Sequence, residues 1–133
     1  MVVVGGAVYL YPLGGSFDVD AVRQMVEVEP TVLLDPCGSG TYMLCHPQSR
    51  KTQARRRISD PTRFPYVGLI VMTAERVMVR HEYADEAGRA SAREIVTWVL
   101  ERYRCRVLDD YNDDFTDLVA QHGPDALYRS RIA

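Results

Sequence analysis

Lysine is almost absent from this chain, which also lacks paired cysteines and any long apolar segment. Lys51 is the only lysine, so arginine carries almost all of the positive charge, and this composition suggests a GC-rich bacterial gene. Cys37, Cys45 and Cys105 form an odd set without a Cys-x-x-Cys pair, which favours reduced cytoplasmic thiols over a disulfide framework. The apolar residues 1–13 lack the basic leader of a signal peptide, and no other stretch approaches the roughly 20 apolar residues that span a bilayer. We therefore expect a cytoplasmic protein without a membrane segment.

The rest of the composition is that of an ordinary globular domain. The chain has 133 residues, of which 47% are hydrophobic and 26% are charged. This length is enough to bury one core without disulfides or metals, so we expect a single domain over residues 1–133. The formal net charge is −2, but residues 1–47 carry −4, residues 48–66 carry +5 and residues 67–133 carry −3. A basic segment therefore lies between two acidic halves.

The first half of the chain predicts three short strands and one helix. Residues 2–11 are rich in Val and Tyr and end at a Pro-Leu-Gly-Gly turn, which indicates a strand. A short amphipathic helix follows, with Asp18 as its N-cap and a proline as its stop signal. Residues 31–34 and 41–45 are two β-type runs around a turn-rich connector, so they predict a hairpin. Residues 47–65 lack apolar periodicity and predict a long, exposed basic loop.

A second hairpin and the longest helix are predicted next. Residues 66–72 and 76–83 form the strand pair, and the alternation within 76–83 indicates one buried and one wet face. Residues 85–103 carry an apolar stripe at helical spacing, with Trp98 expected to be largely buried beside the stripe. Residues 105–108 then predict a strand. After it, Asp113 or Asp114 would cap a last helix that ends at a Gly-Pro stop signal.

The resulting order, β-α-β-β-β-β-α-β-α, predicts an α+β fold. Hairpins in the middle of the chain favour a mixed, mainly antiparallel sheet, with the helices packed on one face. The two β-α-β units would each join parallel strands by a right-handed crossover, as in a ferredoxin-like or related sheet. The pattern does not fix the strand order.

No cofactor or metal motif is complete in this sequence. Gly5-Gly6 follows a hydrophobic run, as in a dinucleotide-binding fingerprint, but the segment continues as a strand and lacks the third glycine. Residues 109–117 are acidic like a calcium loop, but have neither its central glycine nor its closing glutamate. Cysteine and histidine side chains suit zinc, but their spacing here does not. These side chains are Cys37, Cys45, His46 and Cys105. We expect no cofactor, no metal site and no catalytic residue.

An acidic and aromatic segment after the last strand is the first candidate site. It holds more carboxylates than helix capping requires, and its aromatic rings could anchor a partner. Its candidate partner-binding residues are Asp109, Asp110, Tyr111, Asp113, Asp114, Phe115 and Asp117. Because carboxylates steer association with basic surfaces, the segment predicts a protein partner with a basic surface. We expect a small bacterial protein-binding or regulatory protein, of inhibitor or immunity type, rather than an enzyme.

Two alternatives place the site near the basic loop. One is a small-molecule-binding protein or enzyme whose pocket converges on an anion, with Cys37 as a nucleophile and His46 or His81 as its base. Its ligand-binding or anion-binding residues would be Arg55, Arg56, Arg57, Tyr42, His46 and Cys37. The other is nucleic-acid binding through the arginines. The acidic net charge and the scarcity of aromatic residues in the loop argue against nucleic acid.

Overall fold

The computed structural model describes residues 4–29, 31–33, 40–44, 68–82, 84 and 86–128. These residues form strands and helices in the order that the sequence predicts, and the α+β class is confirmed. The elements are β1 (Ala7–Pro12), α1 (Val19–Glu27), β2 (Val32–Leu33), β3 (Thr41–Leu44), β4 (Gly68–Met72), β5 (Val77–Arg80), α3 (Glu86–Arg102), β6 (Cys105–Asp109), α4 (Thr116–His122) and the 3-10 helix η2 (Pro124–Leu127). The basic loop predicted at 47–65 lies outside the described residues.

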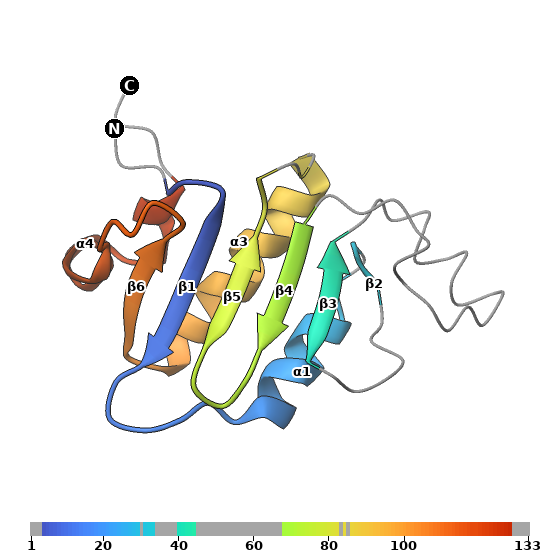
Figure 1. Ribbon diagram of the computed structural model, residues 1–133, viewed down its shortest axis with the longest axis horizontal. Helices are drawn as coiled ribbons and strands as arrows, with labels where there is room; N and C mark the ends of the chain where they lie inside the picture. Colours follow the sequence, from blue (N-terminus) through green and yellow to red (C-terminus); the bar gives the residue numbers. More distant parts are fainter. Residues whose placement is uncertain are drawn as a thin grey trace, which may run out of the picture.

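The described strands form one sheet in the order β2-β3-β4-β5-β1-β6, and every neighbouring pair is antiparallel (Figure 1). Both predicted hairpins are present, as β2–β3 and β4–β5. The parallel strands that the β-α-β units predict are present too, but they are not neighbours. In the first unit, β1 and β2 run parallel with β5, β4 and β3 between them. In the second unit, β5 and β6 run parallel on either side of β1. The first strand, β1, therefore lies in the interior of the sheet and pairs with a neighbouring strand on each side.

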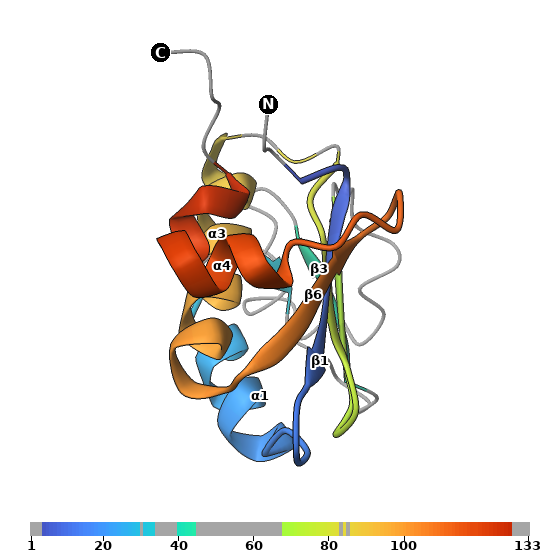
Figure 2. The same cartoon turned by 90° about the vertical axis from the view of Figure 1, so that its left-hand side faces the viewer.

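The helices α1, α3 and α4 all lie on one face of the sheet, as predicted (Figure 2). The apolar stripe of α3 is buried against the sheet, and it supplies Ile95, Val96 and Val99 to the core. Facing strand residues that belong to the same core include Val8, Leu10, Val77, Val79 and Val107. Complete burial of an aliphatic side chain of this size stabilises the fold by about 1.5–3 kcal/mol. This two-layer core holds the strand ends at which the candidate sites lie.

Individual side chains both support and correct the sequence pattern. Asp18 caps α1, since its carboxylate accepts a hydrogen bond from the Ala21 amide at 3.2 Å. Trp98 is only half-buried, whereas we expected it to be largely buried. It lies at the edge of the α3 stripe, where the Arg102 guanidinium covers its ring at 4.3 Å from the centroid. Arginine thus replaces core packing over part of the indole.

None of the described helices is both long and apolar enough to cross a membrane.

Candidate functional site

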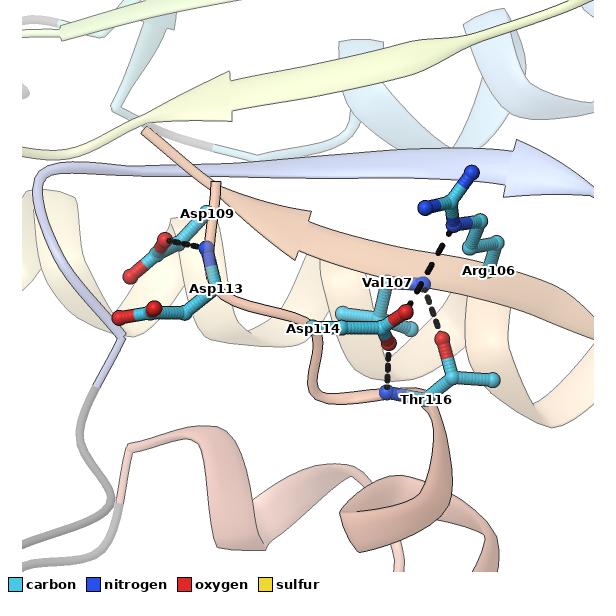
Figure 3. Close-up of polar contacts among 6 residues, drawn as sticks. All are labelled: Arg106, Val107, Asp109, Asp113, Asp114 and Thr116. Atoms are coloured by element: carbon cyan, nitrogen blue, oxygen red, sulfur yellow. Dashed lines mark hydrogen bonds and ion pairs between the residues drawn. The ribbon is translucent and has the colours of Figure 1, made fainter. Parts of the chain in front are cut away.

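The predicted acidic segment forms a tight turn between β6 and α4 that is closed around one carboxylate. Asp109, the last residue of β6, is only 5% exposed. Its Oδ1 accepts hydrogen bonds from the amides of Tyr111 and Asp113, both at 3.0 Å (Figure 3 shows the second). Its Oδ2 accepts a third, also at 3.0 Å, from the Gly5 amide. Three N–H donors satisfy this carboxylate, so Asp109 holds the turn and offers little to a partner.

Backbone contacts make the same turn compact. The Asn112 amide donates to the Asp109 carbonyl at 3.0 Å, and the Asp109 amide donates to the Asp113 carbonyl at 3.1 Å. Asn112 has a φ of 64°, in the left-handed region that asparagine enters more readily than most residues. The turn is therefore defined by both its backbone and its central carboxylate.

The C-terminal side of the turn is tied to the scaffold through Asp114 and Thr116. The Asp114 carboxylate accepts a hydrogen bond from the Thr116 amide at 2.9 Å and pairs with the Arg106 guanidinium at 3.6 Å (Figure 3). Hydrogen bonding to Thr116, assisted by Arg106, lowers the pKa of Asp114. Thr116 Oγ1 in turn accepts from the Val107 amide at 2.9 Å. Asp114 thus bonds the first amide of α4, although the residue at the N-cap position is Phe115.

Gly5 explains how the turn packs against the start of the chain. An added Cβ at Gly5 would lie 2.7 Å from the Tyr111 ring and in collision with the Asp110 carboxylate. At Gly6, a Cβ would lie 2.9 Å from the Glu82 side chain. Both glycines therefore allow close packing ahead of β1, a role unrelated to the pyrophosphate approach in the dinucleotide fingerprint.

The turn leaves five of the seven predicted residues exposed, among them Asp114, whose carboxylate is engaged by Thr116 and Arg106. Tyr111 is 75% exposed, and the carboxylates of Asp110, Asp113 and Asp117 also face solvent. Phe115 is half-buried and packs against the hydrophobic core. The structure thus brings Tyr111 together with exposed acids, while Asp109 and Asp114 serve the turn itself.

The alternative site near the basic loop is represented by Tyr42 alone, because its other residues lie outside the described part of the chain. Tyr42 is 1% exposed and belongs to the core. Its hydroxyl donates to Glu27 Oε1 at 2.8 Å and accepts from the Arg23 guanidinium at 3.3 Å, so it joins β3 to α1. The predicted residues outside the described part are Arg55, Arg56, Arg57, His46 and Cys37.

A pocket that the sequence analysis missed opens beside the first turn of α3. It has a volume of about 820 Å³. Its lining includes Val4, His81, Glu86, Arg89, Arg93 and Tyr128. These residues come from four separate stretches of sequence, so no local motif could mark them. The only available signal was the alternation in 76–83, which placed His81 on the buried face of its strand.

The described residues contain no group of three or more His, Cys, Asp or Glu side chains placed to hold a metal ion. Cys105 is buried, and burial raises the pKa of its thiol to about 11. A thiol in that state is not a nucleophile near neutral pH. Comparison with protein-family models, curated proteins and solved structures finds no match for this chain.

Proposed function

We propose that this chain is a small protein-binding or regulatory protein, of inhibitor type, that uses the turn after β6 to occupy a basic site on a partner protein. The observation that carries this proposal is the exposure of Tyr111 on a turn held by the buried carboxylate of Asp109. Aromatic side chains are frequent anchors of protein interfaces, because they bury much area at little cost in conformational entropy.

The rigidity of the turn favours binding. Asp109 fixes the backbone on both sides of Tyr111, and Gly5 lets the ring lie close against the chain. A loop that is already ordered loses little entropy on association, so more of the contact energy appears as affinity.

Charge around the ring indicates the chemistry of the partner. Asp110, Asp113 and Asp117 are exposed. In the turn as a whole, the Arg106–Asp114 pair is the one ion pair between described residues. Exposed negative charges raise the rate of encounter with a basic surface and disfavour association with an acidic surface. The proposal therefore commits to a partner whose binding site is basic.

The test measures binding kinetics on a partner recovered by affinity capture from cells of the source organism. Neutralising Asp110, Asp113 and Asp117 to Asn should slow association about tenfold at low salt and flatten its salt dependence. The variant Tyr111→Ala should instead speed dissociation about tenfold, which corresponds to about 1.4 kcal/mol.

Matched controls separate the turn from general charge and hydrophobicity. Replacing Glu75, Glu94 and Glu101 with Gln removes the same charge from exposed positions outside the turn. Val28→Ala truncates another exposed apolar side chain, one that is 73% exposed. Both controls should bind like the wild type. Unchanged association by the triple Asn variant together with unchanged dissociation by Tyr111→Ala would refute the proposed interface.

A further inference from the structure

The pocket beside α3 is lined by two residues with buried polar atoms that have no hydrogen-bond partner in the described part of the chain. The atoms are Nδ1 of His81 and the hydroxyl of Tyr128. His81 is 8% exposed, and the two rings meet edge to face with their centroids 5.7 Å apart. Buried polar atoms without partners are rare in native proteins and destabilise them. Both residues line the same pocket, which points to a ligand that supplies the missing bonds.

Positive charge lies at the mouth of the same pocket. Arg89 is exposed and makes no ion pair with a described residue. Arg93 also lines the pocket, where it pairs with Asp125 at 3.2 Å. The first turn of α3, a helix of 17 residues, adds the partial positive charge of the helix dipole. Glu86 opposes these charges, so the position that best receives an anion is beside Arg89 rather than at the helix start.

The protonation states of the two buried groups define what they can bind. Burial lowers the pKa of His81. A hydrogen bond with the Gly5 backbone opposes this effect, Arg89 lowers the pKa further, and nearby Asp110 and Glu82 raise it. Burial also raises the pKa of Tyr128 far above neutral pH. Near pH 7 the imidazole is neutral, with one donor and one acceptor nitrogen, and the phenol is a donor. These groups suit an uncharged polar group of a ligand.

We propose that this pocket binds a small organic anion, whose carboxylate or phosphate contacts Arg89 while a hydroxyl group of the same molecule hydrogen-bonds with His81 and Tyr128. A volume of about 820 Å³ is within the range of small-molecule pockets. Both polar atoms are buried in the unliganded protein, so we expect the Tyr128 side chain to move when the ligand binds. This site is separate from the turn around Tyr111 and does not depend on the function proposed for it.

The test is a nuclear magnetic resonance titration of the full chain with two matched probes, glycerol phosphate and glycerate, against sodium chloride at equal ionic strength. Either probe should cause saturable shifts at the amides of residues 86–90 and at the His81 imidazole, complete by about 10 mM for a dissociation constant near 1 mM. Saturation by one probe alone supports the site and identifies its anionic group as phosphate or carboxylate.

Three variants keep the proposal open to refutation. Arg89→Gln should weaken binding about fivefold or more. Arg104→Gln is the control, because it makes the same charge change at an exposed residue that does not line this pocket, and it should not weaken binding. Tyr128→Phe should weaken binding about threefold while the melting temperature stays equal or rises, because it removes a buried hydroxyl that has no partner. A purely structural role for Tyr128 would not produce that combination.

Three results would overturn the proposal. The first is that neither probe causes saturable shifts. The second is that Arg104→Gln weakens binding as much as Arg89→Gln, which would mean general ionic attraction. The third is that Tyr128→Phe binds both probes like the wild type.

Discussion

At the scale of single residues, His81 should make the stability of this protein depend on pH in a region where few side chains titrate. Its pKa in the folded state lies below the ordinary value of 6.5, chiefly because the ring is buried. As the pH falls below about 6.5, the unfolded chain binds a proton that the folded chain does not, so the free energy of unfolding decreases. The limiting slope for one proton is about 1.4 kcal/mol per pH unit.

Denaturant unfolding at pH 7.5 and pH 5.5 would measure this loss. We expect wild-type protein to be less stable at pH 5.5, and His81→Gln to lose most of that difference. His122→Gln, at an exposed histidine, is the control and should behave like the wild type. Glu29 acts in the opposite direction, because burial raises its pKa. Removing it by Glu29→Gln should enlarge the loss, and a pH dependence that survives His81→Gln unchanged would contradict this account.

At the scale of elements, the turn after β6 contains two aspartates whose substitution should affect the stability of the fold very differently. Asp109 is buried and accepts hydrogen bonds from three amides, whereas Asp113 is exposed. Asp109→Ala leaves those amides without their charged acceptor, so it should destabilise the fold by about 2–3 kcal/mol. Asp113→Ala should change stability by less than about 0.5 kcal/mol. Chemical denaturation of the two variants compares them directly, and equal effects would mean that Asp109 does not hold the turn.

The same turn shows what the sequence can and cannot predict. The helix boundaries follow from local signals such as the Asp18 cap, and Gly123 ends α4 with a φ of 81°. Segment 109–117 can also be recognised from the sequence, because its acidic and aromatic residues are close together in the chain. The role of Asp109 was not predictable, because one of its donors is the Gly5 amide, 104 positions away in sequence.

Long-range pairing also explains the other differences from the sequence pattern. The antiparallel neighbours of β1 are β5 and β6, so the interior position of the first strand depends on contacts across most of the chain. The pocket is assembled in the same way, from residues near positions 4, 81, 89 and 128. Hydrophobic periodicity specifies which face of an element is buried, but it carries no information about which distant element covers that face.

At the scale of the whole molecule, residues 4–6 connect the two candidate sites. The Val4 amide donates to the Leu127 carbonyl at 2.9 Å, and the His81 amide donates to the Gly6 carbonyl at 2.9 Å. Gly5 lies between Val4 and Gly6 in the segment. Its amide donates to the Asp109 carboxylate, and a hydrogen bond with its backbone raises the pKa of His81 against the larger effect of burial. A short segment before β1 thus contacts the turn around Tyr111, the end of β5 and the residues just before Tyr128.

This position predicts that one methyl group at Gly5 disturbs both sites. In Gly5→Ala the added Cβ collides with the Asp110 carboxylate and crowds the Tyr111 ring, so the turn or the segment must move. Crowding of this kind usually costs about 1–3 kcal/mol. We expect a lower free energy of unfolding, with amide chemical-shift changes both at residues 109–113 and around His81. Gly15→Ala is the matched control, since its Cβ would meet no atom within 4 Å, and it should preserve both the stability and the spectrum. Shift changes confined to residues 109–113 would show that the two sites are not linked through this segment.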